Sequence, residues 1–97
     1  METMMDVIRR LANEGYHGQV RAEPSGMRFL DDHEVVDPDC VTVDEVVRVE
    51  GTSSPDEETA ILAVRREHDG HKATYCVTFG THMDPLDADL LQRLTLH

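Results

Sequence analysis

Two strand-like runs at residues 60–68 and 71–79 constrain the fold more than any other feature, because a tight turn joins them. The joining pair, Asp69-Gly70, is the pair that a two-residue type I′ hairpin turn requires. Such a turn also fixes the register of the two strands. The predicted cross-strand pairs are Leu62 with Val77, Val64 with Tyr75, Ala60 with Phe79, Glu67 with Lys72, and His68 with His71.

The first three pairs are apolar and lie on one face of the hairpin, which we assign to the core. Glu67 and Lys72 form an opposite-charge pair across the strands. The same register places Cys76 opposite Ala63, on the face away from His71. The hairpin is therefore expected to cover the core with one face only.

A helix is predicted at each end of the chain. Thr3 can cap the first, over residues 4–14, with Asp6 in the position of a capping box and Gly15 as a left-handed stop. Its apolar positions follow helical spacing; they are Met4, Met5, Ile8, Leu11 and Ala12. The second helix covers residues 85–94, with Asp84 as cap and Pro85 in the first turn. Its apolar stripe consists of Leu86, Leu90, Leu91 and Leu94.

Shorter elements fill the space between. Residues 19–23 and 27–30 read as two strands around a Pro-Ser-Gly turn, and residues 31–39 as an acidic loop. Residues 41–50 are rich in valine, which favours a strand. We therefore predict a single α+β domain over residues 1–97. It has an antiparallel sheet of four to five strands, with the N-terminal and C-terminal helices packed on one face.

Charge enters the valine-rich strand at Asp44, Glu45, Arg48 and Glu50, although charge in a half-buried strand is costly unless it is paired or used. Strict alternation places Asp44, Arg48 and Glu50 on one face and Glu45 among valines on the other. An arginine flanked by carboxylates on a strand can bind a polar ligand. The same arrangement of charged residues is also typical of a solvent-exposed sheet face with cross-strand ion pairs. If the face of Glu45 is covered, its pKa should rise.

The turn that follows contributes Asp56 to the candidate surface. Ser53 and Ser54 lie in the same turn, and no Gly-x-Ser-x-Gly motif marks a nucleophile. The candidate ligand- or partner-binding residues are therefore Asp44, Glu45, Arg48, Glu50 and Asp56. No pair of residues is placed by its spacing for acid–base catalysis, so we predict no catalytic residues.

Histidines and cysteines raise the question of a metal. His68 and His71, opposite each other in the predicted register, would be two ligands, but zinc needs three or four. More distant candidates are His33, His82 and Cys76. Two cysteines without a Cys-x-x-Cys motif argue against a disulfide scaffold, and we expect reduced thiols in the cytoplasm. We expect no cofactor.

Composition limits the partners. Twenty acidic residues face nine basic ones, for a net charge of −11. This charge disfavours non-specific binding of nucleic acid or of an anionic membrane. It fits an ordinary acidic domain, and equally a domain adapted to a salt-rich cytoplasm. The sequence shows no signal peptide and no apolar run long enough to span a membrane. Because the chain is small and has no tryptophan, a homodimer would add useful buried surface.

Several segments together resemble a family of uncharacterised short proteins. They are Gly15-Tyr16, VDEVVRVEG at residues 43–51, SSPDEETAILAV at residues 53–64 and Phe79-Gly80 before an acidic leucine-rich helix. The family pattern is VDE-x-x-R-x-EG-x-(S/T)-x-PD, and some members carry a phosphoribosylpyrophosphate synthetase label. This chain is much shorter than that enzyme and shows no diphosphate-binding loop. Some similar sequences have Cys-x-x-Cys pairs that imply a structural zinc. The matching positions here are Phe29, Asp32, Arg66 and Asp69.

These observations favour a non-enzymatic cytoplasmic module that binds a ligand or a partner protein. One alternative is a small enzyme acting on a phosphorylated sugar or nucleotide, with Arg48 holding the phosphate and Glu45 or Glu50 as base. Another is a metal-dependent module that uses His68 and His71.

Overall fold

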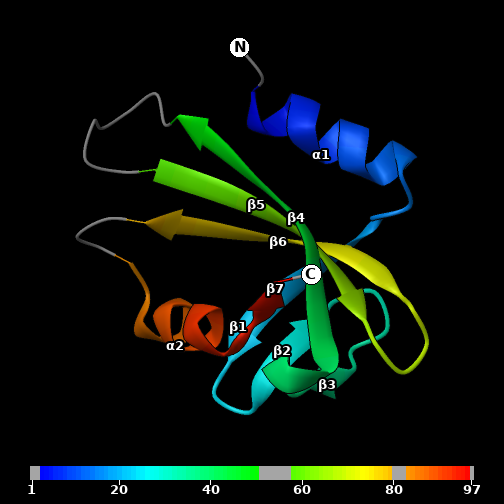
Figure 1. The fold of residues 1–97 in the computed structure, drawn as a ribbon, viewed down its shortest axis with the longest axis vertical. Helices are drawn as coiled ribbons and strands as arrows, with labels where there is room; N and C mark the ends of the chain where they lie inside the picture. The colour runs from blue at the N-terminus through cyan, green and yellow to red at the C-terminus, as the bar shows by residue number, and fades with distance from the viewer. Residues whose placement is uncertain (1–2, 51–57, 80–82, 97) are drawn as a thin grey trace.

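The computed structural model describes residues 3–50, 58–79 and 83–96 (Figure 1). The two helices and a short 3₁₀ helix are α1 Met4–Asn13, α2 Pro85–Arg93 and Pro38–Cys40. The strands are β1 Gly18–Glu23, β2 Gly26–Phe29, β3 Val35–Val36, β4 Val41–Glu50, β5 Glu58–Arg66, β6 Lys72–Phe79 and β7 Thr95–Leu96. None of the helices in these ranges is long and apolar enough to cross a membrane.

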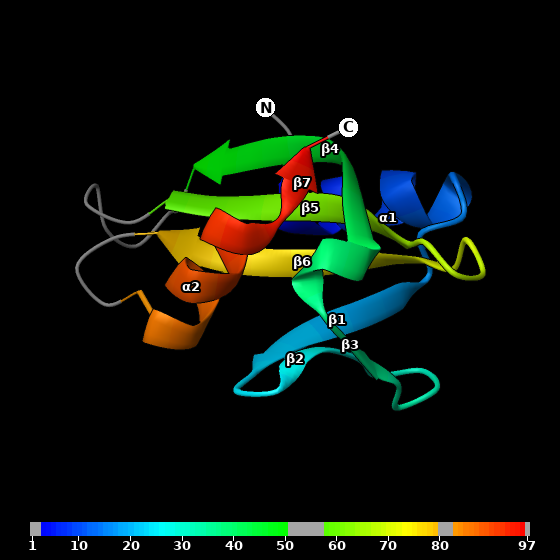
Figure 2. The same ribbon diagram turned by 60° about the horizontal axis from the view of Figure 1, so that its bottom comes forward.

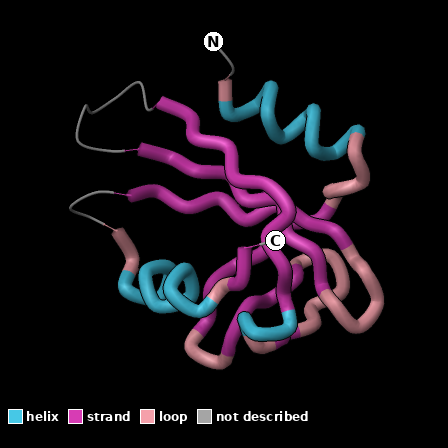
Figure 3. The backbone as a smooth tube through the Cα atoms, viewed as in Figure 1, coloured by secondary structure: helices cyan, strands magenta, loops and turns pink. Residues whose placement is uncertain are grey.

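The strands form one twisted, mixed sheet in the order β3-β2-β1-β6-β5-β4-β7 (Figure 3). Two neighbouring pairs, β1 with β6 and β4 with β7, are parallel, and the others are antiparallel. The fold is α+β as predicted, but the expectation of four to five antiparallel strands was wrong. The two strands that match no predicted range, β3 and β7, are only two residues long and so leave little pattern in the sequence. β3 lies within the segment predicted as an acidic loop, residues 31–39, and the 3₁₀ helix begins in it.

The two helices cover opposite faces of the sheet (Figure 2). Val7 and Leu11 of α1 pack against Ile61 and Ala63 of β5, on what we call the α1 face. Leu90 of α2 belongs to the larger core on the other side, the α2 face. The prediction of both helices on one face was therefore wrong. The reason lies in β5, where five consecutive residues from 60 to 64 are all apolar and all buried, so both faces need a cover.

The β5–β6 hairpin has the predicted core face but a different register. Leu62 pairs with Tyr75 and Ala60 with Val77, a shift of two residues from the prediction. A shift of two preserves the face of every side chain. The predicted face is therefore confirmed: Ala60, Leu62, Val64, Tyr75 and Val77 are buried in the larger core, and Phe79 packs against it.

The shift arises because the connection has four residues, 67–70, rather than two. The Arg66 N–H donates to the His71 carbonyl at 2.8 Å, and the Gly70 N–H donates to the Arg66 carbonyl at 2.7 Å. Gly70 has φ of 73°, which glycine adopts without strain. The predicted pairs of Glu67 with Lys72 and His68 with His71 were therefore wrong. Cys76 lies opposite Ile61 rather than Ala63.

Helix α1 begins at the predicted residue and ends one residue earlier than predicted, and its buried face differs. Thr3 and Asp6 form the capping box, and Gly15 follows the helix with φ of 103°. The buried residues are Val7 and Leu11, whereas Met5 is 65% exposed. In α2, Asp84 caps the helix and accepts a hydrogen bond from the Leu86 N–H at 2.9 Å.

Candidate functional site

A β-bulge divides the predicted site residues between the two faces of β4. Val43 pairs with Val64, and the next paired residue, Glu45, lies opposite Ala63, so Asp44 is the extra residue. The alternation of faces predicted along this strand is therefore wrong after Asp44. Glu45 lies on the α1 face with Asp44, whereas Arg48 pairs with Ala60 on the α2 face.

On the α1 face, Asp44 and Glu45 tie β4 to the neighbouring elements. Asp44 accepts a hydrogen bond from the Tyr16 hydroxyl at 2.8 Å and pairs with Arg65 at 3.3 Å. Glu45 accepts a hydrogen bond from Arg10 of α1 at 2.9 Å. Burial and the hydrogen bond to Asp44 raise the pKa of Tyr16 to about 12, so its hydroxyl remains a donor near neutral pH. Both carboxylates thus make contacts that hold the fold together.

The other predicted site residues lie elsewhere. The Arg48 side chain is 73% exposed, and its guanidinium group lies 3.8 Å from the carboxylate of Glu58. An exposed pair at this distance contributes little to stability. The side chain of Glu50 and the whole of Asp56 lie outside the described residues. The structure therefore brings Asp44 and Glu45 together but separates both from Arg48.

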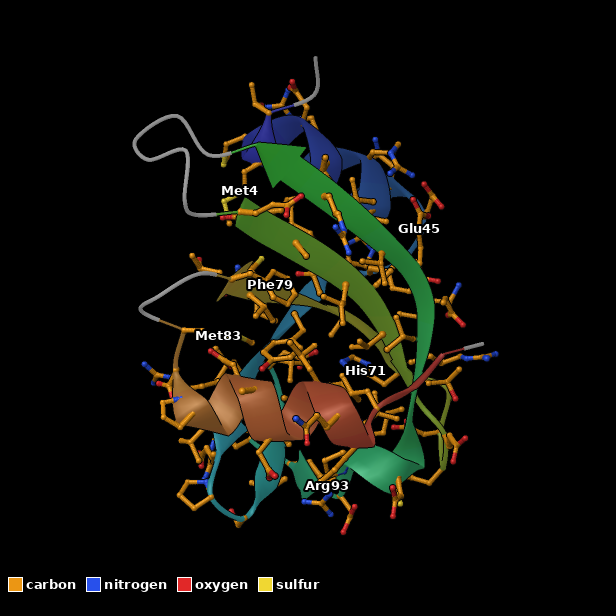
Figure 4. All side chains as sticks on the ribbon, turned by 60° about the vertical axis from the view of Figure 1, so that its left-hand side comes forward. Met4, Glu45, His71, Phe79, Met83 and Arg93 are labelled. Carbon is orange, nitrogen blue, oxygen red and sulfur yellow. The ribbon has the colours of Figure 1, made fainter. Side chains whose placement is uncertain are left out.

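An apolar groove lies beside Arg48 on the α2 face, between the strands and α2. Its volume is about 250 Å³, and its walls are Val43, Val46, Leu62, Phe79, Leu91 and Leu94. Val46 remains 44% exposed at the outer edge of this groove. Figure 4 shows Phe79 and Met83 on the α2 side of the strands, with Glu45 away from them beside α1. The groove could not be seen in the sequence, because strict alternation would place Val46 on the same face as Asp44, whereas the bulge puts the two residues on opposite faces.

His68 and His71 each pair with an acidic residue rather than with each other. His68 Nε2 lies 2.6 Å from Glu34, and His71 Nε2 lies 2.5 Å from Asp31. Among the described residues, no group of three or more histidine, cysteine, aspartate or glutamate side chains is arranged so that it could hold a metal ion. Of the other candidates, His82 lies outside these residues and Cys76 packs toward the α1 face. The geometry thus gives no support to a metal site at His68 and His71.

Arg66 is a buried charged residue that the sequence analysis did not single out. The residue is 3% exposed, and three carboxylates surround its guanidinium group. Asp32 contacts both terminal nitrogens, at 3.2 and 2.7 Å, and Asp69 contacts Nε and Nη2, at 3.0 and 2.6 Å. Glu34 lies 3.0 Å from Nε. The sequence did contain a signal, since Arg66 continues the core-facing series of alternate residues 60, 62 and 64.

The guanidinium group also lies over the Phe29 ring, 4.8 Å from its centre. Phe29, Asp32, Arg66 and Asp69 are the four positions that the resemblance aligned with cysteine pairs. In this chain they meet in a cluster held by charge and by cation–π contact. The cluster fastens the segment after β2 to the turn after β5, which are far apart in the sequence.

Hydrogen bonds from Arg66 lower the pKa of Asp32 to about 2 and hold the pKa of Asp69 well below its usual range. The hydrogen bonds that Arg66 donates to Asp69 and Asp32 raise its pKa above its already high value. Arg66 and both carboxylates are therefore charged at neutral pH.

This cluster makes the fold sensitive to acid. Both carboxyl pKa values lie below the ordinary 3.8, so these groups stabilise the folded state above that value and cease to do so as the pH falls through the folded-state pKa. We expect the free energy of unfolding, from urea titrations, to fall between about pH 5 and about pH 2, and to fall less in Asp32→Asn. Asp89→Asn, at an exposed position of α2, should show the same dependence of the unfolding free energy on pH as the wild type. An equal pH dependence for wild type and Asp32→Asn would contradict the assignment of this acid sensitivity to the Arg66 cluster.

Comparison with family models, with curated proteins and with solved structures gave no match to the chain. We therefore infer function from the residues and their geometry alone.

Proposed function

We propose that this chain is a non-enzymatic interaction module, and that it binds an extended segment of a basic partner protein along the outer edge of β4. The observation that carries the proposal is an open strand edge beside an apolar groove. β7 pairs with β4 only at Thr42 and Val43. Within the described residues, no strand covers the outer edge of β4 from Glu45 to Glu50. An edge of this kind is a template for strand addition.

The direction of the backbone groups can be assigned from the hydrogen bonds at the base of the hairpin. The Arg66 N–H bonds to β6, and the Glu67 N–H bonds to Cys40, just before β4. Because the bonds alternate along antiparallel strands, Glu45, Val47 and Val49 direct their backbone groups toward β5. Val46 and Arg48 then direct theirs outward, so they are available to an added strand.

The groove and the charge define what the added segment would carry. An added strand would place alternate side chains on the α2 face, beside the exposed Val46 and the groove. Apolar residues at those positions would bury this surface. The net charge of −11 favours a partner with basic residues, by electrostatic attraction during encounter and in the complex.

The same geometry disfavours one form of the small enzyme that the sequence left as an alternative. That enzyme would use Arg48 to hold a phosphate and Glu45 or Glu50 as base. Arg48 and Glu45 lie on opposite faces of β4, and Glu45 is engaged with Arg10, so a small substrate on one face would not contact both. The side chain of Glu50 lies outside the described residues.

A displayed library of random decapeptides tests the proposal. Selection on the wild-type chain should enrich sequences that alternate apolar residues and carry lysine or arginine. Arg48→Pro removes one outward N–H without breaking a bond to β5, and edge strands tolerate such a proline. We expect it to weaken binding of the selected peptides by about tenfold or more, measured by fluorescence anisotropy.

Arg48→Ala is the matched control, because it keeps the N–H and removes the same side chain. It should weaken binding by about threefold or less, since the exposed side chain contributes little. If both variants lose binding equally, the arginine side chain and not the strand edge makes the contact. If no peptide is enriched, or if Arg48→Pro binds like wild type while folded, the proposal fails.

A further inference from the structure

A polar cavity lies where two parallel strands separate. β1 and β6 pair only at Gly18 with Ala73 and Gln19 with Thr74, and beyond this point they diverge. Figure 2 shows β1 moving away from β6 toward the side on which α2 packs. A cavity of about 460 Å³ occupies the opening, within the size range of small-molecule sites. It is lined by Gln19, Val20, Arg21, Ala22, Leu30, Tyr75, Cys76, Asp84 and Asp87.

Backbone hydrogen-bonding groups of both strands face this opening. The Leu30 N–H donates to the Gln19 carbonyl at 2.9 Å, which directs Gln19 toward β2 and, by alternation, Ala22 toward β6. The bond from Arg66 to His71 directs Cys76 toward β1 in the same way. Because the strands have separated at Ala22 and Cys76, their N–H and C=O groups line the cavity instead of pairing with each other.

Carboxylates lie at the mouth of the cavity beside α2. One oxygen of Asp84 accepts the Leu86 N–H, and one oxygen of Asp87 accepts the Tyr75 hydroxyl. The second oxygen of each carboxylate has no hydrogen-bond or ion-pair partner among the described residues. Burial raises the pKa of Tyr75, so its hydroxyl stays protonated and keeps Asp87 in place.

A guanidinium group belongs to the opposite face of the sheet. Val20 is buried in the core on the α2 face, so the next residue, Arg21, projects from the α1 face of β1. Arg21 is exposed and makes no ion pair within the described part of the chain. The opening thus has negative charge toward one face, positive charge toward the other and peptide groups between them.

We propose that this cavity binds a short zwitterionic peptide, with its ammonium group at Asp84 and Asp87 and its carboxylate at Arg21. Carboxylates and a guanidinium are the groups that pair with these two ends. The N–H and C=O groups of Ala22 and Cys76 that face the opening match the amide of such a ligand. This site is separate from the edge of β4 and does not depend on the function proposed for that edge.

Amide chemical-shift titration of the ¹⁵N-labelled chain with L-alanyl-L-alanine tests the proposal. We expect saturable shifts at Ala22, Cys76 and Leu86 by about 10 mM dipeptide, corresponding to a millimolar Kd. N-acetyl-alanyl-alanine lacks the ammonium group, and alanyl-alanine amide lacks the carboxylate. Each should bind at least about tenfold more weakly.

Variants locate the site. Asp87→Asn and Arg21→Gln should each weaken dipeptide binding by about tenfold, because each removes one charge partner. The matched controls are Asp89→Asn and Arg9→Gln, which change the same charges at exposed positions that do not line the cavity. Absence of saturable shifts, equal binding of the blocked peptides, or equal losses in the controls would each overturn the proposal. None of these results would bear on decapeptide binding at β4.

Discussion

Arg66→Ala is expected to lower the free energy of unfolding by about 3 kcal/mol, the lower end of what removing one partner of a buried ion pair costs. The lower end applies because the Asp32 and Asp69 side chains remain 44% and 41% exposed, so water partly compensates their loss of a partner. The variant also removes the cation–π contact with Phe29. Urea-induced unfolding at neutral pH, followed by circular dichroism, measures this change.

Arg65→Ala is the matched control from the next position of β5. Arg65 is 39% exposed and pairs with Asp44 at 3.3 Å. A pair of this exposure contributes less than about 1 kcal/mol. If the two alanine variants unfold with the same free energy, the burial of Arg66 and its three carboxylates does not stabilise the fold as we infer.

Leu11→Ala is expected to cost a similar amount, about 3 kcal/mol, because it leaves a cavity between α1 and the sheet. Leu11 is fully buried and packs against β5 on the α1 face. The same urea titration gives the change. Hydrogen exchange should show that the amides of α1 lose more protection than those of α2, since the cavity lies under α1 alone.

Met5→Ala tests whether the buried face of α1 is the observed one or the one predicted from helical spacing. Met5 is 65% exposed, so its truncation should change the free energy of unfolding by less than about 0.5 kcal/mol. A loss as large as that of Leu11→Ala would mean that Met5, and not Val7, belongs to the buried stripe.

Features that depend on neighbouring residues could be predicted from the sequence. The capping box of Thr3 and Asp6 and the glycine after α1 are local chemistry, and the structure has both. The core face of the hairpin was also predictable, because alternation determines a face whatever the exact register. Asp69-Gly70 did not determine the register, since a glycine with positive φ also ends a four-residue connection.

Features that depend on distant residues could not be predicted in the same way. No residue near Asp44 in the sequence indicates a bulge, yet the bulge determines on which face of β4 Arg48 lies. Arg66 is stabilised by Asp32 and Glu34, more than thirty residues earlier in the chain. The placement of the two helices on opposite faces could have been predicted from the sequence. The fully apolar run at residues 60–64 indicates that both faces of the sheet are covered.

For the candidate site, the sequence could predict the segment that carries it but not the groups that form it. The sequence pointed to β4, and within the described part of the chain no strand pairs with its outer edge beyond Val43, but the expected side chains do not act together there. Glu45 bonds to Arg10 of α1, Asp44 bonds to Tyr16 in the connection after α1, and Arg48 lies on the other face. The exposed backbone of this strand and the apolar groove beside it could be recognised only after the position of β7 was known.

The bulge in β4 also determines where this strand can change its length during evolution. Because Asp44 is a single extra residue, its deletion would join Val43 to Glu45 and leave every other side chain on its present face. Deletion of an interior residue after the bulge would instead exchange the faces of a whole segment and move valines away from the core. In distant relatives of this chain, an alignment gap within β4 is therefore expected at one position only.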